Sequence, residues 1–418
     1  MSDLFRSDNV VVRSVPASDL SRWVVTFDNY GIGHGFDRAA FGEDFLRKEG
    51  ISAIHVMGVR EDWYQYAEMA EAMRAVRQAT AGAERVMTYG SSMGGYAALR
   101  FADAAGANAV LALSPQYSID PQKAAFEKRW LQDSQRIQWL PEIDGVLTSQ
   151  AKPVVAFDPS GDDLLHVQLI EESIAISRIE LPYCGHPATT VLGEMGLLGP
   201  LVLQVLDGSL DVEGMRREAR LRRRVSSVHH MRLANLQPPV RVEWGMKLAR
   251  RALELAPHNA GAMAALAARL GQTGQHDEAL ALYEAALAQS NRDPVYLVAL
   301  ADALVTNGRA KEAVALAEET VRRHSAYAHL WYWLAVIRWE ANHREEAVAA
   351  ITKAIELHPQ LETYRLTLDY YHAEMAPPSQ LSGSPAQEKP LRRFRMGIVG
   401  WFRGQGRSSR TKADSAPR

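Results

Sequence analysis

Residues 85–97 read RVMTYGSSMGGYA, and the fold of the first half of the chain depends on this stretch. The apolar run Arg85–Tyr89 predicts a buried β-strand, and Gly95–Ala105 predicts a helix. Between them Ser92 stands in the spacing G-x-S-x-G, with a glycine two positions away on each side. So tight a turn requires glycine at its flanks and holds the serine at the amino end of the helix, where free N–H groups stabilise an oxyanion. We therefore predict that Ser92 is a nucleophile.

Short β-rich runs alternate with helical patterns on both sides of this stretch. Strand and helix in alternation predict an α/β domain over residues 1–208, with a doubly wound, mostly parallel sheet. Residues 121–150 fit no strand, and we expect a helical insertion there, over the carboxyl edge of the sheet. The predicted strands are Trp23–Asp28, Ile51–Met57, Arg85–Tyr89, Ala109–Leu113, Pro153–Phe157 and Ser177–Leu181.

Two later loops carry groups that would serve a nucleophilic serine, which needs a base and an acid that orients the base. Asp158, Asp162 and Asp163 follow the fifth predicted strand, and the loop after the sixth reads PYCGHP, with His186. Together with the glycine-flanked serine, these motifs resemble the α/β-hydrolases over about residues 10–208. In that family the triad follows the chain order serine, acid, histidine.

The resemblance implies a triad of Ser92, His186 and one of the three aspartates. Asp163 is the preferred acid because it lies where these hydrolases usually carry it and a helix follows. Asp158, directly at the strand end, is the alternative, and Asp162 is expected to cap the helix. The motifs are also similar to a bacterial group of compact α/β-hydrolases, some of them associated with surface-glycan or glycoprotein secretion.

The oxyanion hole of such a site uses two backbone N–H groups. One is expected from Met93, and the other from Asn29 or Tyr30 in the glycine-rich loop DNYGIGHG. His34, in the same loop, is expected at the mouth of the pocket. Trp63 and Tyr64 are candidates for its wall, although packing in the core is the preferred explanation.

Composition restricts the remaining possibilities. Forty-seven Lys and Arg residues against 49 Asp and Glu give a net charge of −2, which argues against a nucleic-acid partner. The single cysteine, Cys184, excludes an intramolecular disulfide. The sequence contains neither a metal-binding motif nor a dinucleotide-binding motif with the required spacing. We therefore expect no metal and no cofactor. The start of the chain has no apolar signal segment, so we expect a cytoplasmic protein.

The second half of the chain repeats itself. Residues 209–243 are interpreted as a basic helical linker, with one helix through Arg216–Arg224 that ends before Pro238 and Pro239. Residues 244–375 then carry three 34-residue blocks, 258–291, 292–325 and 326–359, with partial flanking helices. The columns in register are Leu266, Leu300 and Leu334; Gly274, Gly308 and Asn342; Ala279, Ala313 and Ala347; and Leu287, Val321 and Ile355.

This period and these columns resemble the tetratricopeptide family, which implies an all-α repeat solenoid that binds a protein or peptide partner. Residues 376–418 are expected to be a disordered basic tail. Within them, Leu391–Gly404 interleaves basic and apolar side chains, but its glycines favour a solvated tail over peripheral membrane contact.

Three functions agree with these patterns. The preferred one is a serine hydrolase that cleaves an ester or thioester bond of a small-molecule, glycan or lipid acyl substrate and recruits a partner through the repeats. The second is an acyltransferase with the same triad. The third is a repeat scaffold whose hydrolase domain is catalytically silent.

Overall fold

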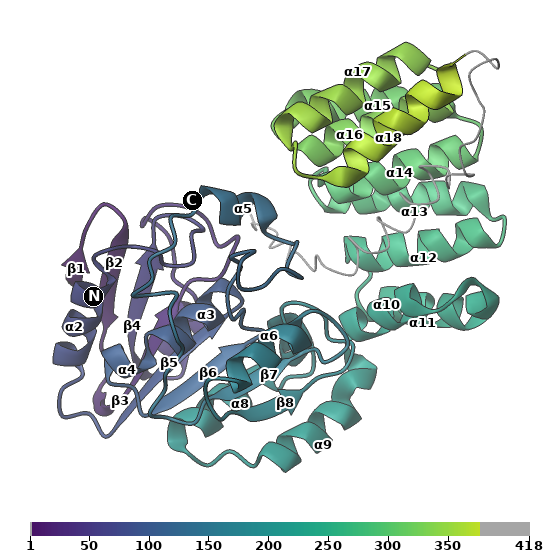
Figure 1. Ribbon diagram of the computed structural model, residues 1–418. Coiled ribbons are helices and arrows are strands. Elements are labelled where there is room, and N and C mark those ends of the chain that lie inside the picture. Colours follow the sequence, from purple (N-terminus) through teal and green to yellow (C-terminus); the bar gives the residue numbers. More distant parts are fainter. Residues whose placement is uncertain (1, 377–418) are drawn as a thin grey trace, which may run out of the picture. The chain divides into compact units, whose positions relative to one another are not determined.

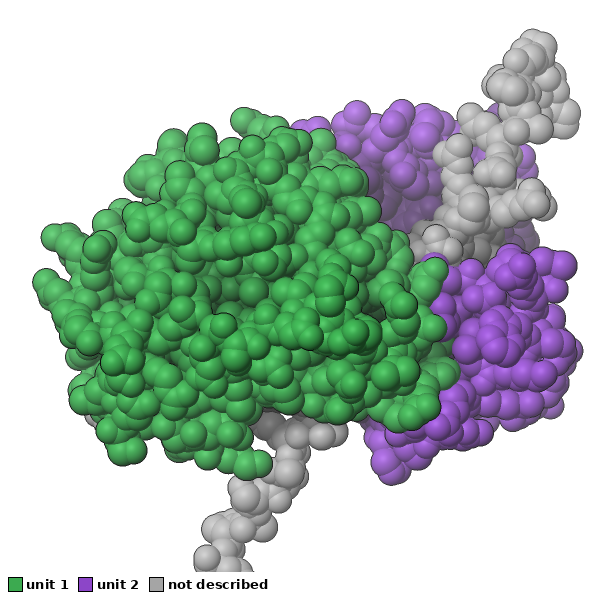
Figure 2. All heavy atoms as spheres, turned by 90° about the horizontal axis from the view of Figure 1, so that it is seen from below, with its two compact units in different colours: residues 1–232, 404–408 green, residues 233–403, 409–418 purple. Residues whose placement is uncertain are grey.

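The computed structural model describes residues 2–376, which form two compact units. The first ends at Arg232 and the second begins at Leu233 (Figures 1 and 2). The division thus falls inside the segment 209–243 that we interpreted as a linker. Residues 377–418, and with them the Leu391–Gly404 segment, lie outside the described residues.

The first unit is built on one mixed sheet of eight strands in the order β1-β2-β4-β3-β5-β6-β7-β8. β1 pairs antiparallel with β2, and β2 antiparallel with β4, whereas every other pair is parallel. The strands are β1 (Ser2–Arg6), β2 (Val10–Val15), β3 (Asp19–Phe27), β4 (Ile51–Gly58), β5 (Arg85–Ser91), β6 (Ala109–Leu113), β7 (Val154–Phe157) and β8 (Ser177–Glu180).

All six predicted strands are present, as β3 to β8, but the first two strands were missed. β1 is a mostly exposed edge strand of five residues that includes Asp3 and Arg6, so it carries no core pattern. β2 reads VVVRSV and is largely buried. Its β-branched run between Asn9 and Pro16 was a usable strand signal that our interpretation left out.

Helices cover both faces of the sheet (Figure 1). One face packs against α2 (Met69–Ala79), α3 (Met93–Arg100), α4 (Ala102–Ala105) and α6 (Asp163–Glu171). The other packs against α1 (Glu43–Lys48), α7 (Thr189–Glu194), α8 (Leu198–Asp207) and α9 (Val212–Arg222). Because both faces are covered, a central strand such as β4 is buried at every residue, which explains its continuous apolar sequence.

Two expectations for irregular regions were wrong. The segment 121–150 is mostly turns and irregular backbone and contains one helix of six residues, α5 (Leu131–Arg136). The predicted basic helix ends at Arg222. A 3-10 turn (Arg223–Val225) and a second helix, α10 (Ser227–Leu236), follow it before the prolines.

The basic helix α9 is solvated on one side only. Its Met215 and Ala219 are buried in the core on that face of the sheet, while Arg217 and Arg220 are exposed. The helix therefore belongs to the first unit as a packed element.

The second unit is entirely helical among its described residues. The three predicted blocks correspond to the hairpins α12 (Ala260–Gln272) with α13 (His276–Gln289), α14 (Pro294–Thr306) with α15 (Ala310–Arg323), and α16 (Ala328–Glu340) with α17 (Arg344–Leu357). The flanking helices are α11 (Val242–Leu255) and α18 (Glu362–Met375). Gly274, Gly308 and Asn342 have positive φ angles of 80°, 74° and 65° at the turns between paired helices.

Candidate active site

Ser92 occupies the sharp turn between β5 and α3. Its φ and ψ angles are 55° and −119°, a combination that a residue with a side chain rarely adopts. Its backbone N–H donates to the carbonyl oxygen of Leu113 over 2.9 Å, which ties the turn to β6. The backbone of Ser92 is therefore held in a strained conformation.

The glycines on either side of Ser92 make this turn possible. A Cβ atom on Gly90 would lie 2.0 Å from the carbonyl oxygen of Gly94. A Cβ atom on Gly94 would lie 2.4 Å from the carbonyl oxygen of Phe27, at the end of β3. The amino end of α3 therefore packs directly against the end of β3, and this brings the loop that contains Asn29 and Tyr30 beside Ser92.

The strand order also places Ser92 where open α/β sheets bind ligands. β3 lies between β4 and β5, so the chain runs toward one edge of the sheet after β3 and toward the other after β5. The carboxyl ends of such neighbouring strands form a crevice at the point where the order reverses. Ser92 follows β5 at this point.

Ser92, His186 and Asp163 form a series of hydrogen bonds. Ser92 Oγ lies 2.8 Å from Nε2 of His186, and Nδ1 of His186 lies 2.9 Å from Oδ1 and 3.1 Å from Oδ2 of Asp163. The three residues come from the turn after β5, the loop after β8 and the first residue of α6. Ser92 is 5% exposed and Asp163 is 3% exposed, so the series is shielded from water.

Burial acts on both titratable members of this series. It lowers the pKa of His186 below 6.5, although the carboxylate of Asp163 opposes the shift. Burial alone would raise the pKa of Asp163. The charges and hydrogen bonds of His186 and Arg129 outweigh it and hold the pKa of Asp163 well below its usual range. A neutral imidazole therefore faces an ionised carboxylate near neutral pH.

The other two aspartates have different roles. Asp158 accepts hydrogen bonds from the backbone N–H groups of Ser160, Tyr183 and Gly185, so it fixes the loop that carries His186. Asp162 stands at the position before α6, but its side chain makes no capping hydrogen bond. Only Asp163 of the three has a hydrogen bond to His186.

Sequence reasoning missed Gln116, which follows β6 in the sequence Ser-Pro-Gln. Its Nε2 lies 3.1 Å from Ser92 Oγ and 3.4 Å from Nε2 of His186, and its Oε1 accepts from Nε1 of Trp63 over 3.3 Å. The side chain is 1% exposed. Its position at the carboxyl end of a strand beside β5 was a signal that could have identified it.

Aromatic rings pack beside His186. The ring of Trp130 lies 5.2 Å from that of His186, edge to face, and 5.6 Å from that of Trp63. Tyr30 completes the cluster, with its ring 5.9 Å from Trp63 and 6.3 Å from Trp130. Trp63 is fully buried, so it belongs to the interior of this aromatic cluster beside the site.

Of the remaining residues predicted for the site, some lie beside Ser92 and others lie elsewhere in the first unit. Met93 is the first residue of α3, whose first N–H groups have no partner within the helix. Asn29 directs its side-chain amide to the carbonyl oxygen of Tyr30. His34, expected at the pocket mouth, is an exposed residue that pairs with Glu61. Tyr64, expected in the pocket wall, is buried, and its hydroxyl binds the backbone of Asp28 and Val56.

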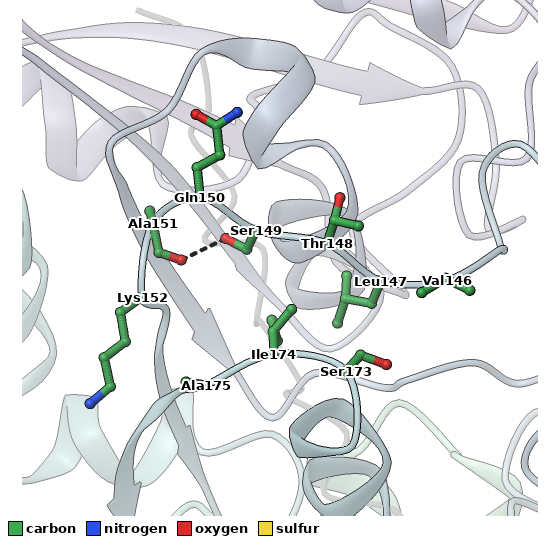
Figure 3. Close-up of a pocket in the computed structure, with 10 residues that line it drawn as sticks. All are labelled: Val146, Leu147, Thr148, Ser149, Gln150, Ala151, Lys152, Ser173, Ile174 and Ala175. Carbon is green, nitrogen blue, oxygen red and sulfur yellow. Dashed lines mark hydrogen bonds between the residues drawn. The ribbon is translucent and has the colours of Figure 1, made fainter.

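A cavity of about 530 Å³ lies elsewhere in the first unit (Figure 3). Residues 146–152 and 173–175 line it. Lys152 and Ala175 come just before β7 and β8, so the cavity lies at the amino ends of strands that run parallel to β5. Ser92 follows the opposite, carboxyl end, and the cavity is separate from the site.

Two features are absent from the described part of the chain. Among residues 2–376, no three or more His, Cys, Asp and Glu side chains are grouped so that they could hold a metal ion. In the same range, no helix combines the length and the apolar character that crossing a bilayer requires.

Comparison with known proteins identifies the repeats. Residues 270–324 and 328–361 match two family profiles that are both described as tetratricopeptide repeat. The C-terminal half therefore contains tetratricopeptide repeats, as the 34-residue period predicts. A human relative, protein O-mannosyl-transferase TMTC1, is 29% identical over 140 residues. These cover 32% of this chain and 15% of that protein, so the chain matches less than a sixth of its relative.

Solved structures show partial likenesses. TTC0263, a tetratricopeptide protein of Thermus thermophilus, has 15% identity and a TM-score of 0.35 over 44% of this chain and 99% of its own. YrrB, described as having an unusual peptide-binding site, has 17% identity and a TM-score of 0.31 over 44% and 91%. The capsule O-acetyltransferase of Neisseria meningitidis serogroup A has 12% identity and a TM-score of 0.33 over 43% and 85%.

Proposed function

We propose that the first unit is a serine hydrolase of the α/β-hydrolase class that cleaves an ester or thioester bond. The observation that carries the proposal is the unbroken series from Ser92 Oγ through His186 to Asp163, with contacts of 2.8 and 2.9 Å. The strained φ of 55° at Ser92 supports it, because backbone strain is retained where function needs it.

The order of the groups along the chain supports the fold class. Ser92 follows β5, the acid Asp163 follows β7 and the base His186 follows β8, in the order serine, acid, histidine that α/β-hydrolases use. The eight-stranded, mostly parallel sheet with helices on both faces agrees with this class.

The proposed reaction has two steps. Ser92 Oγ attacks the carbonyl carbon while His186 Nε2 takes the hydroxyl proton, and Asp163 stabilises the imidazolium that forms. The tetrahedral intermediate collapses, the leaving group takes the proton from His186, and an acyl-enzyme remains. Water then attacks this ester with His186 again as base, which releases the acid and restores Ser92.

The developing oxyanion needs donors that are in place beforehand. The N–H of Met93 at the start of α3 is the proposed first donor. An N–H of Asn29 or Tyr30 is the proposed second, because the contact of Gly94 with the end of β3 holds that loop beside the turn.

Labelling with a fluorophosphonate probe, which reacts only with activated serines, tests the proposal. We expect wild-type protein to be labelled and both Ser92→Ala and His186→Ala to lose labelling. Ser91→Ala is the matched control, since Ser91 is the neighbouring buried serine and its hydroxyl has no hydrogen-bond partner in the structure. Folded wild-type protein that resists the probe would overturn the proposal and favour the silent-scaffold alternative.

Acyl transfer is a second candidate, and the burial of Ser92 and Asp163 favours it. A site that excludes water protects an acyl-enzyme until another acceptor arrives. Product analysis with p-nitrophenyl acetate, with and without glycerol as acceptor, separates the two reactions. Acetylated glycerol as the main product indicates a transferase, and acetate in both reactions indicates a hydrolase.

The tetratricopeptide repeats supply a protein-interaction module. In this proposal they bind a protein or peptide partner, because stacked helical hairpins present an extended concave surface. Whether the partner delivers the substrate is tested by comparing substrate turnover with and without the proteins that co-purify with the full chain.

A further inference from the structure

Arg129, a buried arginine that is not a member of the proposed triad, contacts the triad acid Asp163. Nη1 of Arg129 lies 3.0 Å from Oδ1 of Asp163, and its Nη2 lies 2.6 Å from Oε2 of Glu127. Arg129 and Glu127 come from the irregular segment 121–150, before α5. The ion pairs are almost fully buried, with side-chain exposures of 11% for Arg129 and 1% for Glu127.

Further contacts hold both members of the Arg129–Glu127 ion pair in place. Glu127 Oε2 accepts from Nε2 of His166 over 2.9 Å. The other ring nitrogen of His166 accepts the backbone N–H of Tyr117, which fixes the orientation of the ring toward Glu127. The guanidinium of Arg129 stacks 4.5 Å above the ring of Trp130, the ring that packs against His186.

We propose that Arg129 is a positioning residue of the triad, which acts through Asp163 to set the proton affinity of His186, and that Glu127 moderates the charge of Arg129. This inference rests on the proposed function, because it assigns a role to the surroundings of the same three residues. Asp163 has its carboxylate fixed from two directions, by the imidazole and by the guanidinium, in a site with little water to screen either charge.

The two charges have opposite effects on the imidazolium. The cation of Arg129 repels it and draws electron density from Asp163, so loss of Arg129 should raise the pKa of His186. The anion of Glu127 attracts it, so loss of that charge should lower the pKa of His186. A role in packing alone would not produce shifts of opposite sign.

Other charged groups lie near the loop of His186 and stay constant in the test. Asp158, at the end of β7, accepts the N–H of Gly185. Arg232 of α10 lies against Gly185 and 4.0 Å from Asp158. The buried thiol of Cys184 has a pKa raised by burial and remains protonated.

The test is the pH dependence of the second-order rate of fluorophosphonate labelling in the full chain. We expect the acid limb of Arg129→Met to move to higher pH by about one unit and that of Glu127→Gln to move to lower pH. Arg129→Lys, which keeps the charge, should lie near wild type. Thermal unfolding identifies any variant that fails to fold.

A second readout does not need labelling. The His186 imidazole is titrated by NMR in the Ser92→Ala background, with the same substitutions at Arg129 and Glu127. Opposite shifts of the His186 pKa support the inference even if wild-type protein resists the probe, which would count against the proposed function alone. Shifts of the same sign, or none in folded variants, would overturn it.

Discussion

Gln116 donates a hydrogen bond from Nε2 to Oγ of Ser92 over 3.1 Å, and the side chain is only 1% exposed, so bulk water does not compete for this contact. The same amide lies 3.4 Å from Nε2 of His186. A fixed donor at this place stabilises negative charge on the serine oxygen as its proton leaves. The contact therefore assigns Gln116 to the reacting centre of the proposed enzyme.

Removal of this donor should slow acylation. Gln116→Ala is expected to reduce the rate of probe labelling about 10- to 100-fold, the size of one buried hydrogen bond to a charged group. Trp63→Phe, which removes the N–H that orients Gln116 and reduces the indole to a single aromatic ring, should have a smaller effect. Equal rates in Gln116→Ala and wild type would exclude the role.

Asp163 and Asp158 should respond differently to the same substitution. Asp163→Asn is expected to lower the labelling rate about 10³- to 10⁴-fold, because the imidazolium loses its partner. Asp158→Asn should instead lower the free energy of unfolding, since Asp158 accepts three backbone N–H groups. Labelling rates and denaturant titrations of both variants decide the assignment, and the reverse pattern would make Asp158 the acid.

The labelling rate should depend on pH through His186. The base must be neutral to accept a proton, and burial lowers the pKa of His186 below 6.5. We therefore expect the rate to rise with pH, to reach half its maximum below pH 6.5 and to be flat above about pH 7. Circular dichroism at each pH confirms that the protein is folded. A midpoint above pH 6.5 would contradict the environment described for His186.

Gly94→Ala should destabilise the first unit strongly. The new Cβ would lie 2.4 Å from the carbonyl oxygen of Phe27, and two backbone segments would have to separate. We expect a loss of about 3 kcal/mol in the free energy of unfolding, with loss of labelling. Gly193→Ala in α7 is the control, because its added Cβ would meet no atom within 4 Å apart from the backbone of its own helix. A Gly94→Ala variant as stable as wild type would show that the turn is looser than described.

The repeat turns offer a similar comparison in the second unit. Gly308 has a φ angle of 74°, so Gly308→Ala should cost about 1 kcal/mol through backbone strain, although the added Cβ meets nothing. Gly271→Ala, near the end of α12 with an ordinary φ, should stabilise the helix by up to about 1 kcal/mol. Thermal unfolding of the two variants should therefore change in opposite directions.

The regular parts of this chain were predictable because each repeats a local pattern. The buried strands β6 and β7 are apolar at every position and β4 at most of its positions, and the repeat columns recur every 34 residues. The turn at Ser92 was predictable because its geometry demands glycine at fixed spacing. The edge strand β1 was not, since its exposed polar residues carry no pattern of burial.

The surroundings of the site were less predictable. Gln116, Arg129 and Trp130 lie in segments without periodicity, and the triad residues that they contact are distant in the chain. The choice between Asp158 and Asp163 was open for the same reason: both follow β7, and only the path of the loop after β8 decides which one meets His186. For Tyr64 the sequence left a pocket wall and the core as alternatives, with packing preferred, and its burial agrees with packing.

The ion pair between Arg129 and Asp163 limits which residues of this protein can be exchanged by design. The segment 121–150 looks like an exchangeable loop, suited to grafting from another protein in order to alter substrate preference. A graft without an arginine at position 129 would leave the carboxylate of Asp163 with one partner fewer in a dry site. Such chimaeras should therefore retain residues 127–130, because Trp130 contacts both Arg129 and His186.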